Sequence, residues 1–376
     1  MEIKKIAIVH EWFTTIGGSE NVVEQLLKIF PDAALYGVVD FLKAEDRAFL
    51  GKTEIRPTIL QKFPFISQKN YRNYLAFMPL AIEQLDLKDY EIVISNCHAV
   101  SKGVITGPDQ LHISYLHTPM RYAWDMQNAY LENSQAKGLR SLAARIMLHY
   151  IRIWDSLAAS RPDVLIANSG FIARRIRKFY RRDSHVIYPP VDTDYFSPGG
   201  VRGDFYLAAS RFVPYKRLDL IIEAFKNLPD KKLVIIGEGP DYQKLSRNLP
   251  GNITLMGYQP KEVLRDQMRR CKAFIFAARE DFGILPLEAQ ACGAPVIAFG
   301  QGGALETVRG QGTTKPTGLF FPSQTAAAIQ EAIGEFEKLE ISAQDCRENA
   351  LKFSNQRFQK EFYESVEDSW NSFSRG

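Results

Sequence analysis

Residues 273–289 of this chain read AFIFAAREDFGILPLEA and place two glutamates, Glu280 and Glu288, eight positions apart. The apolar run Ala273–Phe276 predicts a buried strand, and Pro286–Ala291 predicts the next helix, because proline suits the first turn of a helix. A glutamate where a buried strand ends is costly unless donors reach its carboxylate, since burial penalises the charged form. Sugar hydroxyls are such donors. We therefore expect Glu280 to accept hydrogen bonds from a hexose and Glu288 from a ribose diol.

The residues between the two glutamates suit a phosphate. Backbone N–H groups near Gly283, Ile284 and Leu285 would lie at the N-terminus of the predicted helix. Unpaired donors and the helix dipole favour an anion there. Nine consecutive residues thus predict contacts with a sugar, a phosphate and a ribose.

Outside this stretch the chain alternates strands with helices, which is typical of α/β proteins with parallel sheets. Its 376 residues exceed the usual size of one hydrophobic core, so we expect two domains. The pair Pro189-Pro190 disfavours both helix and ladder and predicts the connector between them. We therefore place one Rossmann-like domain at residues 1–188 and a second at 189–356, facing each other across a cleft.

The strands and helices follow from apolar periodicity. The predicted strands are Ile6–His10, Ala34–Val38, Ile92–Ser95, Ile113–His117, Val164–Asn168, Val186–Tyr188, Phe205–Ala208, Lys232–Ile236, Ile253–Leu255, Ala273–Phe276, Pro295–Ala298 and Leu319–Phe321. The predicted helices are Asn21–Ile29, Tyr71–Glu83, Leu139–Ala158, Gly170–Tyr180, Leu218–Asn227, Tyr242–Leu249, Val263–Arg269, Pro286–Ala291, Ala326–Phe336, Gln344–Lys352 and Arg357–Phe373. Ligands of such sheets bind beyond the carboxyl ends of the strands, so we expect the binding residues in those loops.

Two loops of the first half carry candidates. The first strand leads to Gly17-Gly18, which would let backbone N–H groups approach an anion, although a tight turn without a ligand explains the pair equally well. The pattern is neither G-x-G-x-x-G nor a Walker loop, which disfavours dinucleotides and ATP. His117 falls where a strand should end. A lone histidine is more often structural, but this position favours His117 over His98 and His112.

In the second half, Arg211 and Lys216 follow a strand and open a helix, where a guanidinium and an ammonium could converge on a diphosphate. The alternative is a solvated helix start. The segment Met256–Tyr258 ends another strand and could offer backbone groups to a base. The glycines of Gly237–Gly239 are explained more simply by turn chemistry.

The sequence predicts no metal and no cofactor. Asp192-Thr193-Asp194 resembles the D-x-D pattern that holds a divalent metal on a sugar nucleotide, but no third carboxylate or histidine lies beside it. The four cysteines lack metal spacing and suit a reducing cytoplasm. The N-terminal apolar run is too short for a signal segment, and no run approaches the ~18 apolar residues that would span a membrane.

Together these motifs resemble the retaining GT-B glycosyltransferases of glycosyltransferase family 4. The specific match is E-x7-E, from Glu280 to Glu288. The first domain is most similar to bacterial members that act on lipid-linked oligosaccharides in envelope or exopolysaccharide synthesis. The other matching segments, in order along nearly the whole chain, are Gly17-Gly18, YLHT at 115–118, ANSGFIA at 167–173, Arg211-x4-Lys216, GEGP at 237–240, GAPVIA at 293–298 and TGLFF at 317–321.

The resemblance implies metal-independent transfer of a hexose, with retention, from a nucleoside-diphosphate sugar to a saccharide. Family frequency favours UDP, with GDP-mannose next. It also implies that the last helix, within 357–376, returns to the first, acceptor-side domain, whereas 189–356 binds the donor. The residues it assigns are Met256, Gly257 and Tyr258 for the base; Glu288 for the ribose; Arg211, Lys216, Ile284 and Leu285 for the diphosphate; Glu280, Phe282 and Gly283 for the sugar; and Gly17 and Gly18 for the phosphate and acceptor side. His117 would lie near the reactive carbon of the sugar, where its main-chain oxygen or ring would stabilise positive charge. Of these residues, His117, Glu280, Arg211 and Lys216 are expected to be catalytic.

Basic residues concentrate between Lys137 and Arg182, a stretch that contains eleven basic residues and only two acidic ones. Such a field attracts phosphate-bearing partners or an anionic lipid surface. Within it Leu139–Trp154 is amphipathic and cationic, and Leu60–Phe77 interleaves aromatic and basic residues. Both stretches are typical of helices on a lipid surface and also of core helices with solvated arginines, and for Leu139–Trp154 the second alternative is favoured. The first alternative would agree with a polyprenyl-linked acceptor and peripheral attachment to the inner face of the cell membrane.

Two other functions fit parts of the sequence. A sugar-nucleotide 2-epimerase shares the paired layout, but it needs acid and base carboxylates that face the sugar, and the E-x7-E arrangement argues against it. A nucleic-acid binder would use the basic stretch, but the net charge of +4 is small and no recognised module is present. We therefore expect a cytoplasmic enzyme with no nucleic-acid partner.

Overall fold

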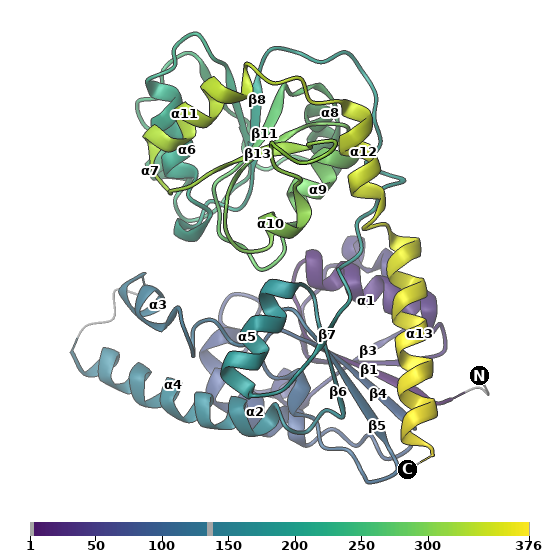
Figure 1. Ribbon diagram of the computed structural model, residues 1–376. Coiled ribbons are helices and arrows are strands. Elements are labelled where there is room, and N and C mark those ends of the chain that lie inside the picture. Colours follow the sequence, from purple (N-terminus) through teal and green to yellow (C-terminus); the bar gives the residue numbers. More distant parts are fainter. Residues whose placement is uncertain (1–3, 134–137, 376) are drawn as a thin grey trace. The chain divides into compact units, whose positions relative to one another are not determined.

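The computed structural model describes residues 4–133 and 138–375, so Lys137, at the start of the basic stretch, lies outside the described residues. The chain forms two compact units, one made of Met1–Pro189 with Phe358–Gly376 and the other of Pro190–Arg357 (Figure 1). The expected connector Pro189-Pro190 lies where the chain passes between them. Each unit is built on one parallel sheet with helices, as the alternation predicted.

The first unit contains a seven-stranded sheet with the order β3-β2-β1-β4-β5-β6-β7. Its strands are β1 (Ile6–Phe13), β2 (Ala34–Asp40), β3 (Ile55–Pro57), β4 (Ile92–Cys97), β5 (Leu111–Leu116), β6 (Val164–Ala167) and β7 (His185–Val186). Its helices are α1 (Gly18–Ile29), α2 (Met78–Glu83), α3 (Gln127–Asn133), α4 (Leu139–Ala158), α5 (Gly170–Tyr180) and α13 (Asn355–Phe373), with 3₁₀ turns η1 (Ala44–Leu50), η2 (Ile59–Lys62), η3 (Tyr71–Phe77) and η4 (Ser101–Gly103).

Both faces of this sheet are covered. Ile6 and Ile8 pack in one cluster with α1 and α13, whereas Ala7 and Val9 pack in another with α2. A strand buried on both faces reads as a nearly continuous apolar run, and the run Ile6–Val9 is why the start of β1 could be recognised in the sequence.

The second unit repeats this design with a six-stranded sheet of order β10-β9-β8-β11-β12-β13. Its strands are β8 (Tyr206–Ala209), β9 (Leu233–Ile236), β10 (Ile253–Leu255), β11 (Ala273–Phe276), β12 (Val296–Phe299) and β13 (Gly318–Phe321). Its helices are η5 (Pro214–Lys216), α6 (Leu218–Lys226), α7 (Tyr242–Leu245), α8 (Lys261–Arg270), α9 (Ile284–Ala291), α10 (Ala304–Thr307), α11 (Ala326–Phe336) and α12 (Ala343–Leu351).

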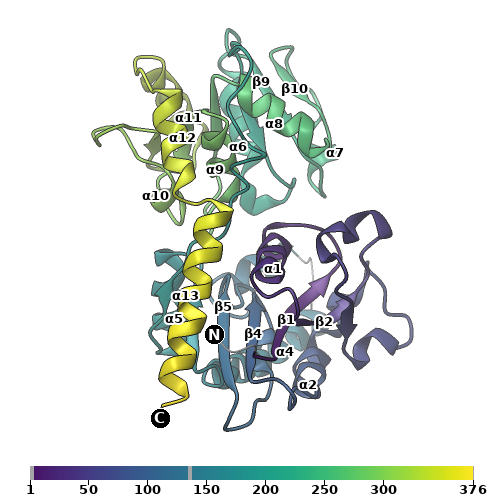
Figure 2. The ribbon, with the colours of Figure 1, turned by 90° about the vertical axis from the view of Figure 1, so that its right-hand side faces the viewer.

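The last helix, α13, returns to the first unit, as the resemblance implied (Figure 2). Phe358 and Phe362 are fully buried, and their rings lie 5.8 and 6.0 Å from the ring of Tyr115 on β5. Gln359 donates a hydrogen bond of 2.7 Å to Gln25 on α1. The core of the first unit is therefore completed by the end of the chain.

Several predicted boundaries are wrong. The strand β1 continues past His10 to Phe13, with polar residues buried inside it. The expected helix Tyr71–Glu83 is a 3₁₀ turn followed by the short α2, because Pro79 lacks an N–H and fits only near a helix start. The segment Leu60–Phe77 consequently forms no long amphipathic helix. The three-residue β3 and the four-residue α10 are too short for periodicity to detect.

Candidate active site

The two sheets place their candidate residues at the same topological position. In each one the strand order reverses direction at its centre, between β1 and β4 in the first and between β8 and β11 in the second. Ligands of open α/β sheets bind beyond the carboxyl ends of two such strands, because the loops that leave these strands run to opposite sides.

In the second unit, the loops after β8 and β11 are joined by an ion pair between Lys216 and Glu280. Both side chains are largely buried, and the pair connects residues 64 positions apart in the sequence. The structure therefore brings together the ammonium predicted for a diphosphate and the carboxylate predicted for a sugar. Arg211, on the same loop as Lys216, is exposed and free to turn toward an anion.

The Glu280 loop rests on two glycines. The main-chain N–H of Gly303 donates to the carbonyl oxygen of Glu280 over 2.9 Å. A Cβ atom on Gly302 would lie 2.4 Å from that same oxygen, and one on Gly303 would lie 2.3 Å from the Cα of Phe282. These approaches are closer than side chains permit, so the glycines hold the loop against the end of β12.

The helix α9 begins directly after this loop. Gly283 is its N-cap in the left-handed region (φ +92°), and the buried ring of Phe282 lies 5.7 Å from that of Phe353. Ile284 and Leu285, the first two residues of α9, are half-buried. The backbone N–H groups of this first turn have no partner within the helix, as an anion site requires.

Glu288 lies within α9, and the helix is buried around it. Burial raises the pKa of its carboxyl to about 7, although the nearby charge of Lys261 opposes that shift and Asp192 adds to it. No hydrogen bond to this carboxylate occurs within the described residues. Glu288 is thus an acceptor without donors, which a ribose diol would supply.

The segment predicted to contact a base follows β10. Gly257 has φ +68°, and its carbonyl oxygen accepts from the N–H of Gly237 over 2.8 Å. Met256 is half-buried and Tyr258 is 72% exposed, so the tyrosine ring is available. Gly237 itself is explained by packing, because a Cβ atom there would lie 1.9 Å from the carbonyl oxygen of Ser210.

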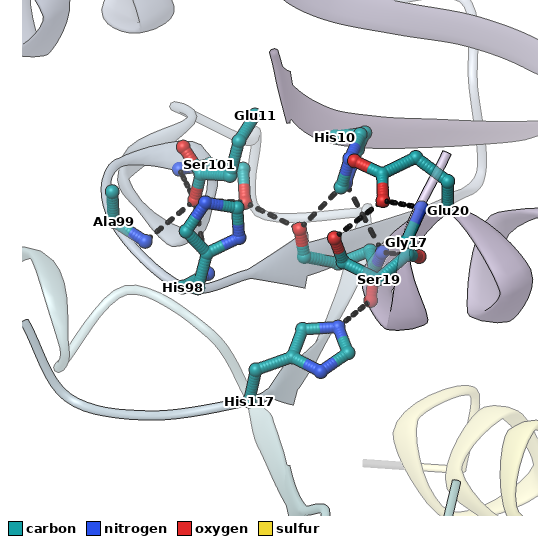
Figure 3. Close-up of polar contacts among 10 residues, drawn as sticks. His10, Glu11, Gly17, Ser19, Glu20, His98, Ala99, Ser101 and His117 are labelled. Atoms are coloured by element: carbon teal, nitrogen blue, oxygen red, sulfur yellow. Dashed lines mark hydrogen bonds and ion pairs between the residues drawn. The ribbon is translucent and has the colours of Figure 1, made fainter. Parts of the chain in front are cut away.

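In the first unit, His117 immediately follows β5 and belongs to a polar network (Figure 3). Its Nε2 lies 2.7 Å from Oδ1 of Asn96 on β4, and Nδ2 of Asn96 lies 3.1 Å from Nδ1 of His10 on β1. Nε2 of His10 lies 3.3 Å from Oε1 of Glu20 on α1. Burial lowers the pKa of His117 to about 3, so its imidazole is neutral at physiological pH.

The glycine loop is attached to the same network. The N–H of Gly17 donates to Oε2 of Glu20 over 2.9 Å, and the hydroxyl of Ser19 donates to that oxygen over 3.0 Å. Burial raises the pKa of Glu20, but the hydrogen bond and charge of His10 outweigh it and the pKa is lowered. Gly17 is exposed and Gly18 half-buried, so this loop remains accessible.

A second carboxylate of β1, Glu11, is fully buried beside this network. It accepts four backbone N–H groups and one hydroxyl, namely His98 N (3.1 Å), Ala99 N (2.8 Å), Val100 N (3.0 Å), Ser101 N (3.1 Å) and Ser101 Oγ (3.0 Å). Burial raises its pKa, yet the charge of His98 and these hydrogen bonds lower it to about 2. Glu11 therefore fixes the loop after β4.

The sequence patterns did not predict a role at the site for His10, Glu11, Glu20 or Asn96. The polar pair His10-Glu11 was interpreted as the end of a strand, whereas both side chains are fully buried within β1. Two adjacent polar residues near the carboxyl end of a central strand could have indicated a functional site, because ligand-binding residues gather at that end of the sheet.

The carboxylates of Asp192 and Asp194, just after the connector, both accept hydrogen bonds from other residues of the protein. Oδ1 of Asp192 accepts from the N–H of Tyr195 over 3.1 Å, and Oδ2 of Asp194 accepts from Gln356 over 2.8 Å. Within the described part of the chain, no three His, Cys, Asp or Glu side chains are arranged to hold a metal ion. None of the described helices is both long and apolar enough to cross a membrane.

Solved structures share this architecture. The HepE protein of Anabaena, crystallised with UDP and glucose, is similar over 97% of this chain and 99% of its own, with a TM-score of 0.68 and 16% identity. Sucrose-phosphate synthase of Thermosynechococcus elongatus is similar over 98% of this chain and 100% of its own, with a TM-score of 0.74 and 15% identity. Two parallel sheets with this likeness define the class of GT-B proteins, which confirms the predicted fold.

Family models identify the protein more closely. Residues 16–195 match the model of glycosyltransferase family 4, and residues 200–353 match that of the group 1 glycosyl transferases. An uncharacterized glycosyltransferase of Methanocaldococcus jannaschii is 24% identical over 94% of each chain. A D-inositol 3-phosphate glycosyltransferase of Mycobacteroides abscessus is 30% identical over 49% of this chain and 46% of its own. The chain is a glycosyltransferase that belongs to the families of these two models, glycosyltransferase family 4 and the group 1 glycosyl transferases, which together cover most of its length.

Proposed function

We propose that this enzyme transfers a hexose from a UDP-sugar to a saccharide with retention of configuration at the reacting carbon. The observation that carries the proposal is the Lys216–Glu280 ion pair beyond the two central strands of the second sheet. It offers a cation for a leaving diphosphate and a carboxylate for sugar hydroxyls. The likeness to HepE, solved with UDP and with UDP-glucose, supports UDP as the nucleotide.

In this mechanism the bond from the sugar to the diphosphate breaks as the acceptor oxygen bonds to the same face of the sugar. Positive charge grows on the sugar and negative charge on the leaving phosphate, which takes the acceptor's proton. Lys216, Arg211 and the first turn of α9 stabilise the departing negative charge, and Glu280 orients the sugar. Preorganised charges of this kind need no metal ion.

The remaining residues take the roles that the resemblance implied. Glu288 binds the ribose, and Met256–Tyr258 contacts the base. We assign Gly17 and Gly18 to the phosphate and acceptor side, and to the neutral ring of His117 we assign the stabilisation of the positive charge that develops on the sugar.

The helix α4 supports a lipid-linked acceptor. One face of α4 packs in the unit, whereas six apolar residues on another face are 46–84% exposed, namely Leu139, Leu142, Ile146, Tyr150, Ile153 and Leu157. The one acidic residue of α4, Asp155, is buried and pairs with Lys102, so the exposed charges of this helix are basic. An apolar stripe with cationic neighbours fits an anionic lipid surface.

A second copy of the chain fits this stripe less well. Pairing two α4 helices in parallel through it would bring Arg140 and Arg145 of one copy close to those of the other, and like charges repel. We therefore propose that α4 rests on the anionic inner face of a membrane, with a polyprenyl-linked saccharide as the acceptor.

Donor binding tests the function. A panel of UDP- and GDP-sugars, assayed for slow hydrolysis and for thermal stabilisation with and without EDTA, should select a UDP-sugar, and EDTA should not change the result. Stabilisation by RNA alone, with steep salt dependence, would support the nucleic-acid alternative instead.

Lipid binding is tested separately with vesicles. The double variant Ile146→Gln, Ile153→Gln should lose binding to vesicles that contain anionic lipid, whereas Leu351→Gln, at an exposed position of α12, should retain it. The lipid-surface proposal would be overturned if the wild-type protein did not bind such vesicles. It would also be overturned if the wild type sedimented as a dimer and the double variant as a monomer.

A further inference from the structure

A chain of hydrogen bonds joins the glycine loop to His117 through three side chains, Glu20, His10 and Asn96 (Figure 3). All three are buried, and none has a role in the transfer described above. These residues come from α1, β1 and β4. The series of hydrogen bonds therefore crosses the centre of the sheet, where the strand order reverses.

The direction of each hydrogen bond near Asn96 is fixed by chemistry. The carbonyl oxygen of Ser19 can only accept, and it lies 2.9 Å from Nδ2 of Asn96. The amide nitrogen of Asn96 therefore faces Ser19, and its oxygen Oδ1 faces His117. Because Oδ1 can only accept, Nε2 of His117 must carry the hydrogen.

The same reasoning applies to His10. The carboxylate of Glu20 accepts from Nε2 of His10, so that nitrogen carries a hydrogen. Nδ1 of His10 then accepts the second N–H of Asn96 over 3.1 Å. The alternative contact of Nδ1, 3.3 Å to the main-chain oxygen of Asn96, requires a doubly protonated ring. In the first of these two arrangements, both amide hydrogens and Oδ1 of Asn96 take part in hydrogen bonds.

We propose that Asn96 is a positioning residue for glycosyl transfer, which holds His117 as the neutral tautomer with its hydrogen on Nε2 and couples that ring to the glycine loop through His10 and Glu20. The other ring nitrogen, Nδ1, then keeps its lone pair and points away from the network (Figure 3). A neutral ring with a fixed lone pair stabilises growing positive charge, whereas an imidazolium would repel it. The inference rests on the proposed function, which places His117 beside the transferred sugar.

Two substitutions separate the donor and acceptor roles of Asn96. Asn96→Asp keeps an acceptor for His117 but loses the N–H groups for Ser19 and His10, and its negative charge should raise the pKa of His117. Asn96→Leu removes every hydrogen bond at similar volume. Ser95→Ala is the matched control, because Oγ of Ser95 lies 2.9 Å from Nε2 of His112, another buried histidine on β5 outside this network.

The first readout is the histidine ring signals of the full-length protein by nitrogen-15 NMR, with His117→Gln used for assignment. Wild type and Ser95→Ala should show His117 with the hydrogen on Nε2, and Asn96→Asp should make its titration visible above pH 5. The second readout is steady-state transfer. Both Asn96 variants should lose about 10²-fold in kcat, with the donor KM within twofold of wild type.

A wild-type His117 with its hydrogen on Nδ1 would overturn the inference, and so would an Asn96→Leu protein with wild-type kcat. Failure of the proposed function would differ, since the wild type itself would then transfer no sugar from any donor while the NMR signals still reported the tautomer.

Discussion

Lys216 and Glu280 form an ion pair that bridges the loops after β8 and β11, the two central strands of the second sheet. Each side chain neutralises the other while both are largely removed from water, so loss of Lys216 removes this ion-pair partner from a largely buried carboxylate. In the proposed mechanism a bound donor takes over both partners, with phosphate oxygens on the lysine and sugar hydroxyls on the glutamate.

Replacement of this lysine should slow the chemical step more than it weakens binding. We expect Lys216→Ala to lower kcat by about 10²–10³-fold, because a preorganised cation aimed at the leaving diphosphate is lost. Lys226→Ala is a matched control, since that lysine pairs with Glu223 on the surface of α6. Equal kcat values for Lys216→Ala and wild type, measured at saturating donor, would remove Lys216 from the site.

Nucleotide binding should depend on pH through Glu288. Its pKa of about 7 means that the carboxyl must lose a proton before it accepts from a ribose diol. The affinity for UDP should therefore fall as pH drops below 7, by up to about tenfold per pH unit, and binding should release a proton. Titration calorimetry in buffers of different ionisation enthalpy measures both effects. Glu288→Gln should remove only the part of the proton release that comes from the Glu288 carboxyl, because the proton released by the phosphate of UDP is the same for both proteins.

The same shift predicts a gain in stability for the ligand-free variant. A carboxyl with a folded-state pKa raised from 4.5 to about 7 destabilises the protein once pH rises through that interval. At pH 8, Glu288→Gln should raise the free energy of unfolding by on the order of 3 kcal/mol, whereas at pH 4 the two proteins should be similar. Urea unfolding at both values measures this, and a variant less stable at pH 8 would contradict the shift.

Glu11 should act in the opposite sense. Its folded-state pKa of about 2, against 4.5, contributes stability above pH 4.5 that is lost as pH falls toward 2. Glu11→Gln should cost on the order of 3 kcal/mol at pH 7, because an amide cannot accept from all the N–H groups that surround it. The difference should shrink at pH 3. Glu24→Gln, at an exposed pair with Lys28, is the control and should have little effect.

The returning helix should be essential to the first unit alone. Phe362→Ala should cost about 3–5 kcal/mol, since a fully buried ring is removed from its core. All four tryptophans, at positions 12, 124, 154 and 370, lie in the first unit, so their fluorescence reports its unfolding. Binding of the donor nucleotide reports whether the second unit is folded. Leu351→Ala, at an exposed position, should leave both signals unchanged.

Most of the fold could be predicted because buried parallel strands are apolar without interruption. The strands β10 and β11 and the helices α4, α5 and α11 have the bounds that periodicity gave. The predicted boundaries are wrong where contacts with distant parts of the sequence determine how far a strand or helix extends. A carboxylate such as Glu11 extends a strand only if backbone donors from another loop meet it, and those donors are some ninety positions away.

The candidate residues of the second unit were predictable because they are contiguous or follow a strand directly. Those of the first unit are not. His10, Glu20 and Asn96 are ordinary polar residues in the sequence, and only the neighbouring positions of β1 and β4 in the sheet bring them together. His117 was found because it stands at a strand end, but its tautomer depends on Asn96, which no local pattern indicates.

The position of α13 also constrains how the chain folds during its synthesis. The second unit is one continuous segment and can fold once it has left the ribosome, whereas the first lacks Phe358 and Phe362 until the residues that follow the second unit have been translated. The half that is made first is therefore finished last, and until then it exposes an apolar surface on its sheet that chaperones would recognise.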